Sequence, residues 1–216
     1  MPRTKSSRRW LDRQFSDPYV KRAQEQGLRS RAAYKLLEIQ EKDHLIRPGM
    51  RVLDLGAAPG GWSQVAARLV GPTGQVFALD LLEMEPIRGV TVLRGDFRED
   101  AVLADLQVRL AGRPVDVILS DMAPNLSGAV AVDQPKALYL AELALDLARE
   151  QLKPGGVLLV KLFQGEGFDH FLRQFRDRFA QVLTRKPKAS RPESRELYLV
   201  GKGFRDGSEP RRGRAA

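Results

Sequence analysis

Three aspartates follow apolar runs of strand length, at positions where their carboxylates could hold a ligand. They are Asp80, Asp96 and Asp121. A carboxylate at the end of a parallel strand can accept both hydroxyls of a ribose, and Asp96 could accept an adenine amino group while Phe97 packs near the ring. Three acids at successive strand ends favour a nucleoside ligand that carries a positive charge, such as the sulfonium of S-adenosylmethionine.

A loop of small residues precedes these acids in Val52-Leu-Asp-Leu-Gly-Ala-Ala-Pro-Gly-Gly-Trp-Ser63. Small residues let the backbone bend tightly and approach a ligand closely. The loop has neither the Gly-Lys-Ser/Thr ending of a phosphate loop nor the Gly-x-Gly-x-x-Gly spacing of a dinucleotide loop. We therefore predict a nucleoside pocket of another type, with Asp54 and Gly56 among its residues.

The surrounding pattern predicts an α/β fold. Strand-like runs are expected at 51–55, 75–81, 90–93, 115–120, 157–163, 181–185 and 197–200, and helices at 18–26, 30–42, 61–70, 99–111, 135–152 and 167–179. Ser30 is expected to cap the second helix. Strands that alternate with helices predict a mainly parallel sheet with helices on both faces, with ligands at the carboxyl ends of its strands.

Composition excludes several kinds of chemistry. The 216 residues carry a formal net charge of +9 and include no cysteine and only two histidines. Disulfides, thiolate metal sites and a cysteine nucleophile are therefore excluded, and we expect no metal. Because no apolar run reaches the length of a membrane span and no apolar signal segment follows the basic start, we expect a cytoplasmic protein.

Positive charge is concentrated at the two ends of the chain. Residues 1–35 hold ten basic and three acidic side chains, whereas residues 36–184 hold sixteen basic and twenty acidic ones. Basic flanks of this kind favour binding to a nucleic acid through its phosphates. We expect a basic arm over 1–17, one domain over 18–205 and a basic, disordered tail over 206–216.

Four segments together resemble the FtsJ/RrmJ (RlmE) family. They are Asp54-Leu-Gly-Ala-Ala-Pro-Gly-Gly-Trp62, Ser120-Asp-Met-Ala-Pro-Asn125, Val160-Lys-Leu-Phe-Gln-Gly-Glu-Gly167 and Ser194-Arg-Glu-Leu-Tyr198. This resemblance implies a Rossmann-like methyltransferase with seven strands, the last antiparallel. It also implies S-adenosylmethionine-dependent methylation of a uridine ribose 2′-hydroxyl in 23S ribosomal RNA of the large subunit. Cofactor contacts are implied at Gly60, Trp62, Asp80, Asp96 and Asp121.

The resemblance also implies a catalytic Lys-Asp-Lys-Glu set at Lys35, Asp121, Lys161 and Glu196. A ribose hydroxyl is a poor nucleophile at neutral pH, so Lys161 is expected to act as its base or to stabilise the developing alkoxide. Sequence alone does not decide between these roles. Lys35 and Glu196 can reach the site only if the last strand lies beside the fifth and the N-terminal helix folds over the strand ends.

Basic residues near these positions are candidates for gripping RNA phosphates: Arg29, Arg31, Lys186, Lys188, Arg191 and Arg195. Two alternatives stay open. One is a related 2′-O-methyltransferase acting on tRNA or an mRNA cap, and the other is a ribosome-assembly factor that binds RNA without catalysis. We expect a monomer, because no spare apolar helix face stands out.

Overall fold

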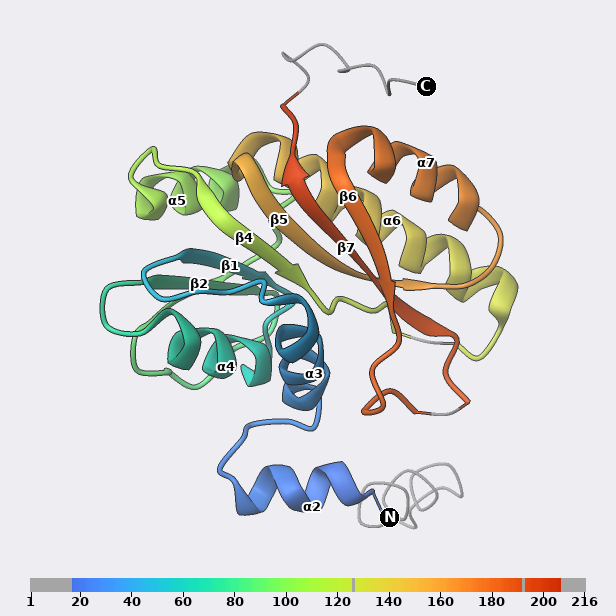
Figure 1. Cartoon of the computed structure of the whole chain (residues 1–216), viewed down its shortest axis with the longest axis horizontal. Helices are drawn as coiled ribbons and strands as arrows, with labels where there is room; N and C mark the ends of the chain where they lie inside the picture. The colour runs from blue at the N-terminus through green and yellow to red at the C-terminus, as the bar shows by residue number, and fades with distance from the viewer. Residues whose placement is uncertain (1–16, 126, 192, 207–216) are drawn as a thin grey trace.

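The computed structural model describes residues 17–125, 127–191 and 193–206 (Figure 1). The predicted basic arm, apart from Asp17, and the predicted tail, apart from Asp206, lie outside these residues.

A seven-stranded sheet in the order β3-β2-β1-β4-β5-β7-β6 forms the centre of the protein. Its strands β1 to β5 are parallel, and β7 runs antiparallel to both β5 and β6, which confirms the predicted mixed sheet. The strands are β1 (Arg51–Leu55), β2 (Gln75–Asp80), β3 (Val90–Arg94), β4 (Val115–Ser120), β5 (Leu152–Phe163), β6 (Phe179–Arg185) and β7 (Glu196–Phe204).

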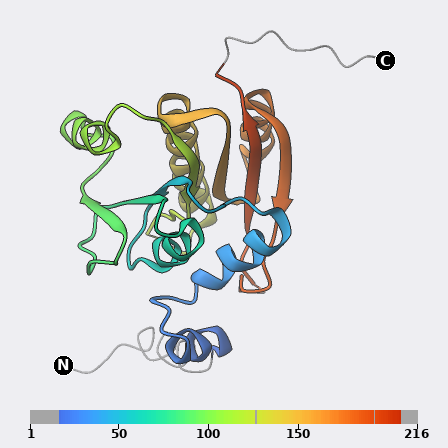
Figure 2. The ribbon, with the colours of Figure 1, turned by 60° about the vertical axis from the view of Figure 1, so that its left-hand side comes forward.

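Helices cover both faces of the sheet (Figure 2). They are α3 (Ala33–Asp43), α4 (Gly61–Val70), α5 (Asp100–Leu110), α6 (Val130–Gln151) and α7 (Phe168–Arg178). A further helix, α2 (Pro18–Glu25), lies beyond α3 and away from the sheet (Figure 1). Alternate residues of a strand point to opposite faces, so Leu53 and Leu55 pack with α5, α6 and α7, whereas Val52 packs with α3 and α4. The strands are therefore apolar on both sides, as a covered parallel sheet requires.

The start of α3 differs from the prediction. This helix begins at Ala33, and Ala32, not Ser30, is its N-cap, without a side-chain capping bond. Ser30 instead lies against the start of α4, where a Cβ added to Gly61 would meet its Oγ at 2.2 Å. Packing between the two segments thus overrides the local capping preference of serine.

The strand order creates a crevice between β1 and β4. From β1 the chain proceeds to β2 and β3 on one side, and it then returns to continue with β4 and β5 on the other. Loops after β1 and β4 therefore diverge at the carboxyl edge, where open α/β sheets bind their ligands. The carboxylates predicted to hold a ligand all lie at or just after carboxyl ends of strands.

Candidate active site

Lys161 and Asp121 form a buried ion pair at the end of the sheet. Lys161 lies on β5, and its Nζ is 2.9 Å from Oδ1 of Asp121, which follows β4. The same Nζ donates a hydrogen bond to the main-chain oxygen of Asp121 at 2.6 Å. Because β4 and β5 are parallel neighbours, the sheet itself brings the two groups together.

A second ion pair joins Lys35 to Glu196. The Nζ of Lys35, on α3, is 2.7 Å from Oε1 of Glu196, the first residue of β7. In the antiparallel register of β5 and β7, Glu196 lies opposite Phe163, and Lys161 lies opposite Tyr198. The predicted placement of the last strand and the N-terminal helix is therefore confirmed, and all four residues of the predicted set lie in one neighbourhood.

Tyr198 joins the two pairs, and the sequence analysis did not include it in the site. Its hydroxyl donates a hydrogen bond to Oδ1 of Asp121 at 2.7 Å, while Nζ of Lys35 lies 5.6 Å from the centre of its ring. A signal was present, because Tyr198 is two residues after Glu196 and thus shares its face of the strand.

The charges in this cluster are removed from water. Lys35, Lys161 and Glu196 are only 6 to 8% exposed. Burial disfavours the carboxylate of Asp121, but the ammonium groups of Lys161 and Lys35 outweigh it and hold the pKa of Asp121 below its ordinary value. Burial and the charge of Asp121 raise the pKa of Tyr198, so its hydroxyl keeps its proton.

A basic cavity of about 450 Å³ opens beside the two ion pairs. Five cationic side chains line it, with acidic and polar ones between them: Arg31, Lys35, Ala123, Asp133, Gln134, Lys161, Phe163, Arg191, Glu193, Ser194, Arg195 and Glu196. Both lysines of the cluster therefore face a space that an anionic, hydroxyl-bearing substrate can enter.

A second cavity of about 290 Å³ lies at the carboxyl ends of β1 to β4. Its lining is mainly apolar, with a few charged groups: Gly56, Leu79, Asp80, Leu81, Gly95, Asp96, Phe97, Arg98, Met122, Pro124, Lys136, Tyr139, Leu140 and Leu143. Met122 and Pro124 face this cavity, whereas Ala123 between them faces the basic one. The short segment after Asp121 thus separates the two spaces.

Asp80 and Asp96 both line the second cavity, with fixed carboxylates. Asp80 accepts hydrogen bonds at 2.8 Å from the amides of Ala58 and Leu82. Asp96 forms an ion pair with Arg98, which lowers the pKa of Asp96. Since each carboxylate oxygen has two lone pairs, Asp80 retains acceptor capacity for a ligand. Both oxygens of Asp96 already accept two hydrogen bonds from Arg98, so a ligand at Asp96 would replace part of that contact.

The glycine loop approaches this cavity through Gly56. A Cβ at Gly56, whose φ is +69°, would lie 2.5 Å from Cγ of Met122, so only glycine fits without displacing that side chain. Asp54 is buried behind the loop, where it accepts a 2.6 Å hydrogen bond from the Ser63 hydroxyl. Gly60 does not line the cavity, and the Trp62 side chain bonds to the main-chain oxygen of Ala32. A ligand contact at Trp62 would therefore involve its backbone.

Asp54 makes a testable contribution to stability. Its burial, opposed by the Ser63 hydrogen bond and assisted by the charges of Asp121 and Asp80, raises its pKa from 3.8 to about 7. Between pH 3.8 and about pH 7, Asp54 keeps its proton in the folded protein but has released it in the unfolded chain. The contribution of Asp54 to the free energy of unfolding therefore falls as pH rises through this range. We expect Asp54→Asn to remove this loss, which is at most about 4 kcal/mol.

Urea unfolding of both proteins between pH 4 and pH 8 tests this expectation. The difference in unfolding free energy between Asp54→Asn and the native chain should shift in favour of the variant as pH rises. If the unfolding free energies of the two proteins, plotted against pH, stay parallel over this range, the expectation is wrong.

The predicted RNA-binding residues divide into two groups. Arg31, Arg191 and Arg195 line the basic cavity, and Lys186 and Lys188 are exposed on the loop between β6 and β7. That loop lies beside α3, where the amides of Lys188 and Ala189 donate hydrogen bonds to Glu38.

Arg29 belongs to neither group. Its guanidinium donates hydrogen bonds to the main-chain oxygens of Pro59, Glu85 and Pro86. The structure thus gives it a contact that holds the loop after β2 against the glycine loop, and we leave it out of the RNA surface around the basic cavity.

Within the described parts of the chain, no cluster of three His, Asp or Glu side chains could hold a metal ion. None of the helices described there has the length and hydropathy needed to cross a membrane.

The strand order, the cavity beside the glycine loop and the adjoining cluster of paired lysines and acids define a Rossmann-like methyltransferase. Residues 28–204 match the model of the FtsJ-like methyltransferase family, and the chain belongs to this family. A methyltransferase needs a methyl donor, and the second cavity offers a nucleoside donor both acidic acceptors and apolar walls.

Similar proteins support this assignment. The chain is 59% identical over 209 residues to ribosomal RNA large subunit methyltransferase E of Pseudomonas fluorescens, covering 97% of this chain and 100% of the relative. It is 63% identical over 202 residues to the protein of that name from Alkalilimnicola ehrlichii, covering 94% and 97%. A Plasmodium falciparum structure described as a ribosomal RNA methyltransferase aligns with a TM-score of 0.73 and 31% identity, covering 82% and 98%.

Proposed function

We propose that this protein transfers a methyl group from S-adenosylmethionine to a uridine ribose 2′-hydroxyl in 23S ribosomal RNA of the large ribosomal subunit. The observation that carries the proposal is the pair of buried ion pairs, Lys161–Asp121 and Lys35–Glu196, beside a basic cavity. The large-subunit target is supported by the names of relatives that match nearly the whole chain.

The second cavity, which we call the donor cavity from here on, has a lining that suits S-adenosylmethionine. In the proposed binding mode Asp80 accepts the ribose hydroxyls and Phe97 packs near the adenine ring. Asp96 accepts the adenine amino group in place of one of its hydrogen bonds to Arg98. Gly56 lets the backbone approach the donor, and Gly60, Asp54 and the backbone of Trp62 are proposed to shape this side of the site. When bound, the donor supplies an electrophilic methyl group on a sulfonium, which the Asp121 carboxylate favours by charge.

Lys161 is placed to act on the substrate hydroxyl. An ammonium has three N–H donors, and two of those on Lys161 are used by Asp121, one on the carboxylate and one on the main-chain oxygen. The third is available to the basic cavity that Lys161 lines. We propose that this N–H stabilises the charge that develops on the ribose oxygen, since such donors contribute most when they are fixed in advance. The proton of that hydroxyl would leave to water, which the basic cavity admits.

Lys35, Glu196 and Tyr198 position this group. Lys35 is held by Glu196 and lies over the ring of Tyr198, whose hydroxyl in turn fixes Asp121. A buried ion pair needs such partners, because an unpaired charge in this setting is strongly destabilising. The arrangement keeps Asp121, and through it Lys161, in one orientation.

The decisive experiment is transfer of labelled methyl groups to ribosomal subunits, free 23S RNA and tRNA. Labelled, alkali-resistant dinucleotides from large-subunit RNA are the expected product, because 2′-O-methylation blocks alkaline cleavage. Label only in tRNA would favour the related enzyme, and RNA binding without transfer to any substrate would favour an assembly factor.

The basic rim gives a separate prediction. We expect Arg191→Ala and Arg195→Ala to weaken RNA binding, and each lost phosphate contact to reduce the slope of log affinity against log salt by about 0.7 to 0.9. Donor affinity should not change, because neither residue lines the donor cavity. Arg109→Ala, on the exposed side of α5, is the matched control. A salt slope equal to that of the native protein would contradict this role.

A further inference from the structure

A basic groove runs along α4, outside both cavities of the site. It encloses about 600 Å³ between α4 and the segment before β3. Arginine, glycine and proline dominate its lining, which among the described residues includes no acidic side chain: Arg29, Gln64, Ala67, Arg68, Gly71, Pro72, Pro86, Ile87, Arg88 and Gly89. The groove is therefore both electropositive and rich in accessible backbone.

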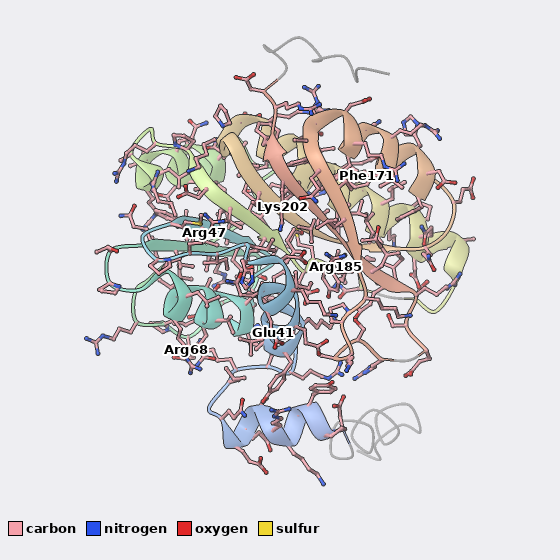
Figure 3. The ribbon with its side chains drawn as sticks, in the orientation of Figure 1. Glu41, Arg47, Arg68, Phe171, Arg185 and Lys202 are labelled. Carbon is pink, nitrogen blue, oxygen red and sulfur yellow. The ribbon has the colours of Figure 1, made fainter. Side chains whose placement is uncertain are left out.

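Its three arginines have different surroundings. The guanidinium of Arg29 is bound to main-chain oxygens of the opposite wall and so fixes the width of the groove. Arg68 and Arg88 are exposed, one on each wall. Figure 3 shows Arg68 on the side of α4 that faces away from the sheet. Arg68 and Arg88 can therefore bind a ligand without breaking a contact that supports the fold.

The groove and the basic cavity adjoin one short segment of the chain. Arg29 lines the groove, and Arg31, two residues later, lines the basic cavity. This segment is anchored on α4, because the amide of Arg29 donates a hydrogen bond to Oε1 of Gln64, a residue that also lines the groove. Basic side chains thus follow one another from the basic cavity, past the start of α3, to the outer side of α4, with Arg31 among them paired to Asp17.

We propose that this groove binds the sugar–phosphate backbone of the substrate RNA at nucleotides away from the one that enters the basic cavity. This inference rests on the proposed function, which supplies an RNA substrate. Guanidinium groups bind phosphate oxygens through paired N–H donors, and arginines on both walls suit a strand lying between them. A protein partner fits less well, because Ile87 is the one large aliphatic side chain among the described lining residues.

The test compares the double variant Arg68→Gln, Arg88→Gln with a matched double variant on α7, Arg173→Gln, Arg176→Gln. Figure 1 shows α7 and α4 at opposite ends of the molecule. RNA binding is measured against salt with 23S RNA fragments of increasing length that contain the target. The KM for methyl transfer is measured with the same fragments and with large subunits.

For long fragments we expect the groove variant to bind about tenfold more weakly near 0.1 M salt, with a salt slope smaller by about 1.4 to 1.8. KM should rise in parallel, while kcat and donor affinity stay unchanged. For fragments too short to extend beyond the basic cavity, the groove variant should have the same affinity and salt slope as the native protein. The α7 variant should match the native protein throughout.

Equal affinity and slope for the groove variant and the native protein at every length would overturn the proposal. So would a defect confined to assembled subunits and absent with naked RNA, since that would indicate a protein contact. A third outcome separates the two proposals. If the native protein transfers no methyl group to RNA, and the groove variant still loses the affinity that depends on fragment length, the proposed function fails and the groove contact stands.

Discussion

Lys161→Ala should lower kcat for methyl transfer by about a hundredfold to a thousandfold, the cost of removing one fixed donor to a developing oxygen charge. Donor affinity should change little, because Lys161 lines the basic cavity and not the donor cavity. The variant leaves Asp121 with the Tyr198 hydroxyl and the nearby Lys35 charge, so we expect it to fold.

Single-turnover kinetics with bound donor, together with calorimetric titration of the donor, separate these two effects. Lys153→Ala is the matched control, because Lys153 lies on the same strand but pairs with Asp116 at the surface. A Lys161→Ala protein that no longer binds the donor, or one that turns over normally, would refute the assigned role.

Asp80→Ala should produce the opposite pattern, a loss of donor affinity of about a hundredfold or more, the value of two hydrogen bonds to a charged group. At saturating donor, most of kcat should remain, because Asp80 does not line the cavity that holds the lysines. Titration of S-adenosylmethionine gives the affinity, and methyl transfer at high donor concentration gives kcat.

Asp80 also holds the amides of Ala58 and Leu82, so the alanine variant could disturb the loops themselves. Asp80→Asn retains one acceptor and should lose less affinity than the alanine variant. Glu83→Ala, in the exposed loop after β2, controls for a nearby change of charge. Native donor affinity in Asp80→Ala would show that the donor is held elsewhere.

Local pattern was sufficient for most of the fold. The strands 51–55 and 115–120 and the helix 61–70 have the predicted bounds. Short, mainly apolar runs mark the two strands, and Gly60 and Gly71 flank the helix. β5 was predicted too short, as Gly155 and Gly156 separate its first residues from the apolar run that follows. The apolar runs also predicted seven strands, whereas the antiparallel direction of the last strand was implied only by the family resemblance.

The sequence by itself determined which chemical groups this protein can use: the acids at strand ends, two lysines, and no cysteine. These follow from residue types and short-range spacing. Only the tertiary structure decided which of them meet, because the ion pairs Lys35–Glu196 and Lys161–Asp121 depend on how β7 aligns with β5 and how α3 packs. The linking hydroxyl of Tyr198 and the structural contacts of Arg29 are likewise set by packing, which local periodicity does not encode.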